Sequence, residues 1–186
     1  DFTDQLFIAK YPGARGSSLK AIAVDSAGWA SFSGLANSAR TPDQKLLFAN
    51  FDRAPGTSTD VAASGGSNDE MHVLVIDENG LFSGVAGEIL EAHAFVSKAS
   101  DAKKIDGSSN YVKNVLRNES LYIWLGQVLK ITESTTDSGS EVPAGSLKAG
   151  HTFQLINAAA AADQIIGGSL SGGLDGATIA EDTKQI

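Results

Sequence analysis

Two apolar runs on either side of an Asn-Gly turn limit the possible folds of this chain more than any other part of it. The first run, residues 71–76 (MHVLVI), is rich in β-branched side chains and ends at the turn 77–80 (DENG); the second run covers residues 89–96. Runs at this spacing predict a pair of antiparallel strands. Gly84 and Gly87 lie between the turn and the second run, which predicts a bulge or a wide loop. We expect this hairpin to form the core of the fold.

The composition excludes several classes of protein. The chain has 186 residues, 42% of them hydrophobic and 19% charged, as in one sizeable globular domain or two small ones. The net charge is −8 and the 14 basic residues are scattered, so we expect no nucleic-acid partner. No apolar run approaches about 18 residues, so we expect no membrane insertion. Cysteine is absent, which excludes disulfides and thiolate chemistry within these residues and fits a reducing compartment.

The remaining patterns predict short strands and short helices joined by polar turns. Strands are expected at 19–24, 46–51, 121–125, 128–131 and 152–156, and helices at 5–9, 111–117 (capped by Ser109 or Asn110) and 158–166. Loops, helical turns or linkers are expected at 27–40, 52–69, 97–106, 132–150 and 167–176. Many short strands without alternating β-α-β units indicate an α+β fold, mainly antiparallel β, in which a two-layer β-sandwich-like domain is flanked by short helices.

Three histidines, His72, His93 and His151, are the first candidates for metal binding. None stands three or four residues from another and no cysteine is near, so the spacing of a zinc site is missing. His72 and His93 could meet across the predicted hairpin, but ordinary histidines on a sheet face are the simpler interpretation. The turn 77–80 differs from a calcium loop because its glycine is fourth rather than sixth. We expect no metal and no other cofactor.

Glycine and serine motifs do not indicate catalysis either. Gly80, Gly84 and Gly87 lack the spacing of a dinucleotide site, and Ser64 and Ser83 lack the context of a hydrolase nucleophile. The loop 172–176 (GGLDG) could bind an anion through its amides, although a chain reversal between domains is simpler. The tripeptide 118–120 (NES) matches a glycosylation acceptor without any other sign of secretion. We expect no catalytic residues, and we predict that the chain is not an enzyme.

The aromatic residues Trp29, Phe48, Phe51, Tyr122 and Trp124 stand at strand spacing. Packing in a core or an interface explains them better than a platform for sugars or bases. A β-rich domain with polar loops and no catalytic constellation is most simply a structural or interaction module.

Several stretches, in order, resemble the contractile tail sheath proteins of T4-like bacteriophages. Residues 9–20 (AKYPGARGSSLK) resemble the A-x-Y-P-G-x-x-G-N-x-L stretch common to sheath proteins, with Ser17-Ser18 in place of the usual Asn. The stretch 90–103 (LEAHAFVSKASDAK) resembles the family's V-L-E-x-x-x-x-V-S-K-A-x-D-A-K. The loop 172–176 resembles the one that leads into the C-terminal sheath domain. Together with 46–58 and the rest of 68–124, these stretches cover most of the chain.

The resemblance implies a structural role in a virion. Sheath subunits stack in rings around an inner tail tube, and their rearrangement drives the tube through the host envelope. Residues 1–170 would be the middle, protease-resistant sheath domain, a β-sandwich with short helices, and residues 171–186 would be the glycine loop and the start of the next, inner domain. The chain would then be an internal portion of a longer protein, with an outer, variable domain inserted just before Asp1.

The resemblance also implies partners and a location. The partners would be other copies of the sheath protein and, through regions outside these residues, the inner tail tube, the baseplate and the tail terminator. The protein would reside in the virion, and in the host cytoplasm during assembly. Because a contracting sheath stores energy in its extended lattice, no nucleotide site is needed.

Two other classes of function stay open. A carbohydrate- or receptor-binding β-sandwich module would use Trp29 and the loops 52–69 and 132–150 as its binding face. A hydrolase would use a pair of acidic residues drawn from Asp69, Glu70, Asp77 and Glu88.

Overall fold

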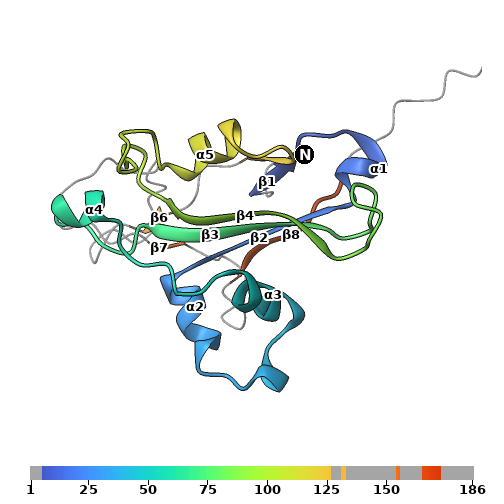
Figure 1. Ribbon diagram of the computed structural model, residues 1–186, viewed down its shortest axis with the longest axis horizontal. Helices are drawn as coiled ribbons and strands as arrows, with labels where there is room; N and C mark the ends of the chain where they lie inside the picture. The colour runs from blue at the N-terminus through green and yellow to red at the C-terminus, as the bar shows by residue number, and fades with distance from the viewer. Residues whose placement is uncertain (1–5, 127–130, 133–153, 156–164, 173–186) are drawn as a thin grey trace, which may run out of the picture.

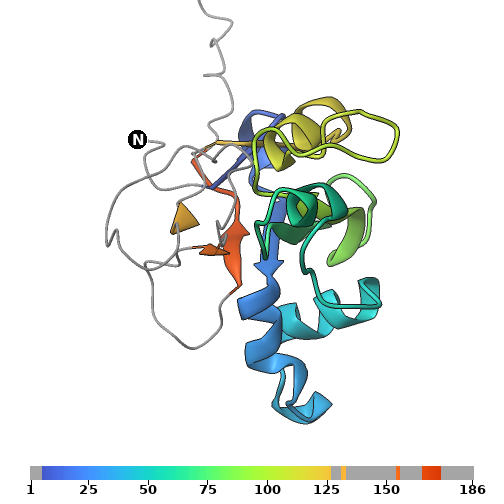
Figure 2. The ribbon, with the colours of Figure 1, turned by 90° about the vertical axis from the view of Figure 1, so that its left-hand side faces the viewer.

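The computed structural model describes residues 6–126, 131–132, 154–155 and 165–172. A four-stranded antiparallel sheet forms the middle layer, in the order β4-β3-β2-β8. Its strands are β2 (Leu19–Asp25), β3 (Glu70–Asp77), β4 (Glu88–Ser97) and β8 (Ile166–Ser169). Figure 1 shows α5, β1 and β5 on one face of this sheet and α2 and α3 on the other, and Figure 2 shows the same layers from one end.

Two short strand pairs accompany the main sheet. The strands β1 (Phe7–Ala9) and β5 (Ile123–Leu125) pair in antiparallel, and so do β6 (Ile131–Thr132) and β7 (Gln154–Leu155). Phe7 of β1 and both Ile123 and Leu125 of β5 belong to the same apolar cluster as the central strands, so the β1–β5 sheet packs against the main sheet. The predicted α+β fold, mainly antiparallel and built from packed sheets with flanking short helices, is confirmed.

The helices are short and lie between or after the strands. They are α1 (Gly13–Gly16), α2 (Ser26–Ser33), the 3-10 helix η1 (Asn37–Ala39), α3 (Pro42–Asn50), α4 (Thr59–Ala63) and α5 (Val112–Asn118). Asp25, Thr41 and Ser58 cap the starts of α2, α3 and α4 with side-chain oxygens that accept backbone hydrogen bonds.

The two central strands separate two apolar cores because their side chains alternate between the faces of the sheet. The main core takes alternate residues of β2 and β3 and packs them against β1, β5 and α5: Leu19, Ala21, Ala23, Met71, Val73, Val75, Phe7, Ile123, Leu125, Val112, Val115 and Leu116. The second core takes the intervening residues and packs them against α2 and α3: Ile22, Val24, Leu74, Ile76, Trp29, Phe32, Leu47 and Phe51. Every residue of β3 is buried.

The hairpin that the sequence predicts is confirmed, and its connection is a wide loop. Residues 78–87 join β3 to β4, and the ladder shows register shifts at two points, between Met71 and Val73 and between Val75 and Ile76. Gly80 has a φ of +77°, and a Cβ on it would lie 2.9 Å from the backbone nitrogen of Ala86. A glycine is therefore required at this position of the loop.

Predicted elements near the termini need correction. The expected helix at 5–9 is wrong, because residues 7–9 form β1, whose partner β5 lies more than a hundred residues further along the chain. The expected glycine linker at 167–176 is wrong at its start, because Gly167 and Gly168 belong to β8. A Cβ at Gly167 would overlap the carbonyl oxygen of Ala21 in the neighbouring strand, so glycine allows this close pairing.

Three predictions between β2 and β3 also fail. The expected strand at 46–51 is α3, which begins with a capping box between Thr41 and Gln44. The expected loop at 27–40 contains α2 and η1. The surface loop at 52–69 includes α4, whose Val61 is buried in the main core.

The strand at 19–24 and the turn at 97–106 are confirmed, and the helix expected at 111–117 is α5. Its N-cap is Tyr111 rather than Ser109 or Asn110, although the Ser109 hydroxyl accepts a hydrogen bond from the Tyr111 N–H at 3.3 Å. The strand expected at 121–125 begins later, at Ile123.

Several predictions fall on residues outside the described ranges. Most of the expected strands at 128–131 and 152–156 lies there, although Ile131 and residues 154–155 are in strands as expected. Most of the expected loop at 132–150 and the loop 173–176 also lie there. So does most of the expected helix at 158–166, but its last residue, Ile166, belongs to β8. The domain boundary between residues 170 and 171 remains a prediction, because residues 173–186, most of the second expected domain, lie outside the described ranges.

Candidate interaction surface

Asp77, the last residue of β3, is a fully buried carboxylate that organises the hairpin loop. Its oxygens accept five hydrogen bonds of 2.8 to 3.0 Å, from the N–H groups of Leu81, Phe82 and Ser83 and the hydroxyls of Ser18 and Ser83. Burial alone would raise the pKa of Asp77, but these bonds outweigh it and lower the pKa to about 2. The carboxylate is therefore charged at neutral pH and holds the loop 78–87 against the end of the sheet.

The other acidic candidates do not form a pair free for acid–base chemistry. Asp69 is buried, and its carboxylate accepts from the Ser58 N–H at 2.7 Å and from the Ser97 hydroxyl. Glu70 accepts from the Gly56 N–H at 2.9 Å. Glu88 is exposed and faces Asp77 across the ladder, but the oxygens of Asp77 are already occupied. The hydrolase hypothesis therefore gains no support from these four residues.

A buried lysine that the sequence analysis did not single out connects three elements. Lys98 is 0% exposed, and its Nζ lies 3.3 Å from Oδ2 of Asp25. The other oxygen of Asp25 accepts from the Gly28 N–H at 2.9 Å and caps α2. Burial lowers the pKa of Lys98, and the attraction of Asp25 and Asp69 opposes this shift. The pair therefore ties the ends of β2 and β4 to the start of α2.

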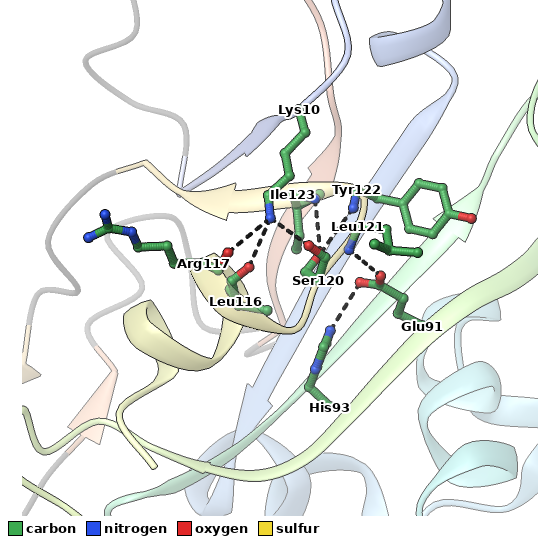
Figure 3. Close-up of polar contacts among 9 residues, drawn as sticks. All are labelled: Lys10, Glu91, His93, Leu116, Arg117, Ser120, Leu121, Tyr122 and Ile123. Carbon is green, nitrogen blue, oxygen red and sulfur yellow. Dashed lines mark hydrogen bonds and ion pairs between the residues drawn. The ribbon is translucent and has the colours of Figure 1, made fainter. Parts of the chain in front are cut away.

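Lys10 makes a second connection, to the end of α5. Figure 3 shows its Nζ donating to the carbonyl oxygens of Leu116 (3.2 Å), Arg117 (3.3 Å) and Ser120 (2.5 Å). The first two belong to the last turn of α5, whose carbonyl groups have no partner within the helix, and the third follows the helix. The buried Ser120 hydroxyl accepts from the backbone N–H groups of the next turn. Ser120 of the glycosylation-like tripeptide is thus part of the fold.

Glu91 connects β4 to the same turn. Its Oε1 accepts from the Leu121 N–H at 2.6 Å, and its Oε2 lies 3.0 Å from Nε2 of His93 (Figure 3). Burial would raise the pKa of Glu91, but the hydrogen bonds from His93, Ser120 and Leu121 outweigh it and lower the pKa.

His72 lies in the second core, on the other face of the sheet from His93. Its ring stacks on Phe51 at a centroid distance of 4.1 Å. Nδ1 accepts from the Phe95 N–H at 3.1 Å, so Nε2 carries the proton and donates to the Arg53 carbonyl at 3.0 Å. Burial lowers the pKa of His72, which favours this neutral form.

His72 and His93 do not come together as metal ligands. His93 pairs with Val73 in the ladder, so it projects from the opposite face to His72. His151 lies outside the described residues. Within the described residues, no group of three or more His, Cys, Asp or Glu side chains could hold a metal ion.

The aromatic candidates divide into buried and exposed sets. Trp29 is only 6% exposed and packs in the second core, where its ring stacks on Phe48 at 4.6 Å. It therefore cannot form the binding face that the carbohydrate hypothesis assigns to it. Trp124, by contrast, is 46% exposed, because β5 turns alternate residues outward and buries Ile123 and Leu125.

A group of exposed and half-buried rings forms what we call the aromatic patch. Its centre consists of Tyr11, Phe82 and Tyr122, whose ring centroids lie 4.9 to 6.3 Å apart. We include with them three exposed residues that are close to Phe82 and Tyr122 along the chain, Leu81, Leu121 and Trp124, which are 48%, 68% and 46% exposed. Phe82 and Tyr122 also pack on the main core. The Arg15 guanidinium lies 5.8 Å from the Phe82 ring, and the Lys10 ammonium lies 5.6 Å from the Trp124 ring.

The aromatic patch is the strongest candidate for a functional feature. Large exposed apolar side chains that gather on one surface are typical of contact sites with another molecule.

Comparisons with protein-family models and with curated proteins find no match to this chain. Among the described helices, none has the length and apolar character needed to cross a bilayer.

Proposed function

We propose that this chain is part of a structural subunit of a contractile bacteriophage tail sheath, and that it acts as a rigid domain within an assembly of identical copies. Its chemistry would be that of packing and interfaces rather than of catalysis. The subunit would polymerise around an inner tail tube, and the rearrangement of copies would drive the tube through the host envelope. It would have no enzymatic activity of its own.

The observation that carries this proposal is where the sheath-like stretches lie in the fold. The stretch 9–20 supplies Lys10, which binds the carbonyl groups at the end of α5. The stretch 90–103 supplies Ser97 and Lys98, which bind the buried carboxylates of Asp69, just before β3, and of Asp25 in β2. The residues that carry the resemblance therefore join separate elements into one body.

A rigid body is what such a role requires. Subunits that rearrange while they stay folded move as whole domains, and the interfaces between them change instead. Two cores on the two faces of one sheet, together with the buried Lys98–Asp25 pair at the ends of β4 and β2, support this behaviour.

The test is electron microscopy of the full-length protein that contains this chain. We expect tubes or stacked rings from the full-length protein and a monomer from residues 1–186 alone, as measured by light scattering. A full-length protein that stays monomeric at high concentration, and that does not label the tails of virions, would overturn the proposal.

One observation favours a second candidate, a carbohydrate- or receptor-binding module. The exposed ring of Trp124 stands two residues from Tyr122, whose ring lies 6.3 Å from that of Tyr11, and it offers an aromatic surface on which a sugar could stack. Micromolar binding to a defined glycan that is lost in Trp124→Ala, but kept when the half-buried Phe48 of the second core is changed to Leu, would favour this function. The absence of binding across a broad glycan array would eliminate it.

A further inference from the structure

The Asn-Gly pair at the start of the loop 78–87 has a chemistry that the proposed function does not use. Asn79-Gly80 is the only Asn-Gly pair in the 186 residues. Asn79 is exposed, and within the described structure its side chain makes one hydrogen bond, from Nδ2 to the Ser17 carbonyl oxygen at 3.4 Å. This bond is longer than an ordinary N–H···O bond, so the side-chain amide of Asn79 is weakly held.

The backbone nitrogen of Gly80 is also available. No described group accepts a hydrogen bond from the Gly80 N–H, although the Gly80 carbonyl oxygen accepts from the Gly84 N–H at 3.0 Å. Because glycine has no Cβ, nothing on residue 80 obstructs the approach of its nitrogen to the side chain of Asn79. A weakly held amide therefore stands directly before a backbone nitrogen without a described partner.

A second pair of the same class, Asp106-Gly107, has the opposite arrangement. The Asp106 carboxylate accepts from the N–H and the hydroxyl of Ser108 at 2.9 and 2.6 Å, and the Gly107 N–H donates to the Lys104 carbonyl oxygen at 2.9 Å. Both groups that would have to react are thus already bound, which makes Asp106-Gly107 an internal control.

We propose that Asn79-Gly80 is a site of spontaneous covalent modification, at which Asn79 converts to aspartate and isoaspartate through a cyclic imide. The Gly80 nitrogen attacks Cγ of Asn79, the new N–C bond closes a succinimide ring, and Nδ2 leaves as ammonia with the proton of the Gly80 N–H. Water then adds to one of the two ring carbonyl groups. Opening at Cγ gives aspartate, and opening at the backbone carbonyl gives isoaspartate, in which the main chain runs through Cβ and Cγ.

The isoaspartyl product lengthens the main chain where the loop has no room for an extra atom. A Cβ on Gly80 would already lie 2.9 Å from the backbone nitrogen of Ala86. The residues that follow are fixed, because the Asp77 carboxylate accepts from the N–H groups of Leu81 at 3.0 Å and Phe82 at 2.8 Å. An added methylene between residues 79 and 80 should displace these donors from Asp77, so the modified loop loses its anchor on the sheet.

Peptide mapping of the aged protein tests the modification. The full-length protein that contains this chain is incubated at pH 8 in its folded state, and samples are digested with a protease that cleaves after glutamate. Cleavage after Glu78 and Glu88 releases residues 79–88, which contain no other asparagine. Tandem mass spectrometry follows this peptide together with the exposed Asn37 and Asn118, which precede residues with side chains, and Asp106. An unaged sample, digested in the same way, corrects for conversion during digestion.

We expect Asn79 to convert to a mixture of aspartate and isoaspartate while Asn37 and Asn118 stay amides and Asp106 keeps its normal linkage. The absence of conversion at Asn79 would overturn the inference. Equal conversion at Asn37 and Asn118, or conversion of Asn79 only in the urea-unfolded protein, would also overturn it, because the structure would then not select this site.

Two variants test the effect on the loop. Asn79→Gln keeps an amide, but its longer side chain closes the ring poorly; Asn79→Asp, measured fresh, carries the new charge with a normal main chain. We expect the urea midpoint of the wild type to fall during ageing as isoaspartate accumulates, that of Asn79→Gln to stay constant, and that of fresh Asn79→Asp to lie close to the fresh wild type. An unchanged midpoint after conversion would overturn the proposed release of the loop. The inference does not require assembly, so electron micrographs of the fresh protein test the sheath function separately.

Discussion

Replacing Asp77 by asparagine should weaken the fold by releasing the loop 78–87 from the end of the sheet. The substitution keeps the size of the side chain but turns one acceptor oxygen into an N–H donor. Oδ2 of Asp77 accepts three of the five hydrogen bonds, two of them from the backbone N–H groups of Phe82 and Ser83. An amide nitrogen in that position would face these donors, and they would lose their partner in a buried site.

The structure sets the size of the effect. The pKa of Asp77 falls from an ordinary value of 3.8 to about 2 in the folded protein. At about 1.4 kcal/mol for each pKa unit, the charged form contributes about 2.5 kcal/mol to the stability of the folded state at neutral pH. We expect Asp77→Asn to lower the free energy of unfolding by about 2 to 3 kcal/mol at pH 7.

The pH dependence has a definite sign. A carboxyl group whose pKa is lower in the folded state stabilises the fold above its unfolded pKa, and this stabilisation is lost as the pH falls toward the folded pKa. The difference between the wild type and Asp77→Asn should therefore be constant above about pH 5 and shrink between pH 4 and 2.

Urea unfolding followed by tryptophan fluorescence at pH 7, 4, 3 and 2 measures both effects. Glu88→Gln is the matched control, because Glu88 faces Asp77 in the ladder but is exposed; it should change the stability by less than about 0.5 kcal/mol. Equal stability of wild type and Asp77→Asn at pH 7, or a difference that does not change with pH, would refute the assignment of Asp77 as the anchor of the loop.

Three further substitutions test the cores and the buried charges. Val75→Asp places a carboxylate in the main core and should leave the protein unfolded, with loss of the circular dichroism signal and of any sheath assembly; normal assemblies would show that the hairpin is not core. Lys98→Met leaves Asp25 buried without its cation and should cost about 3 to 5 kcal/mol, and Lys98→Met with Asp25→Asn should recover part of this loss in urea unfolding; a neutral single variant would contradict the pairing. Because burial lowers the pKa of His72, the wild type should lose stability as the pH falls below 6.5, and His72→Phe should unfold with a smaller pH dependence between pH 7 and 5; an unchanged dependence would place the titration elsewhere.

Sequence patterns predict the central hairpin and β2 well because these elements depend on local signals. The β-branched run at 71–76 and the alternation at 19–24 both indicate buried strands without reference to the rest of the chain. Their burial on both faces was not predicted, since α2 and α3, which cover the second face, were expected to be a loop and a strand.

The failed predictions have two physical causes. At α3, the apolar run at 46–51 led to the prediction of a strand. The local signal for a helix was present, because Thr41-Pro42 is a typical helix start and Gln44 is its capping partner. At β1 and β8, no local signal exists. Three residues around Ile8 and the glycines at 167 and 168 form strands only because β5 and β2 lie beside them in the folded chain.

The candidate site could be predicted only in part. Tyr122 and Trp124 stood out as aromatic residues, but the sequence gives no means of separating them from Trp29, because exposure depends on which element covers each ring. Tyr11 and Phe82 join the patch from two segments far apart in the chain.

The position of β2 and β3 between two cores has a consequence for how the domain opens. Each of these strands contributes side chains to both apolar clusters. Neither cluster can therefore lose the packing of β2 and β3 while the other keeps its native packing. Partial opening is confined to elements that touch one cluster only, such as α2 or the β1–β5 pair. Amide hydrogens of residues 20–24 and 71–76 should therefore exchange with solvent only when the whole domain unfolds, as one cooperative unit.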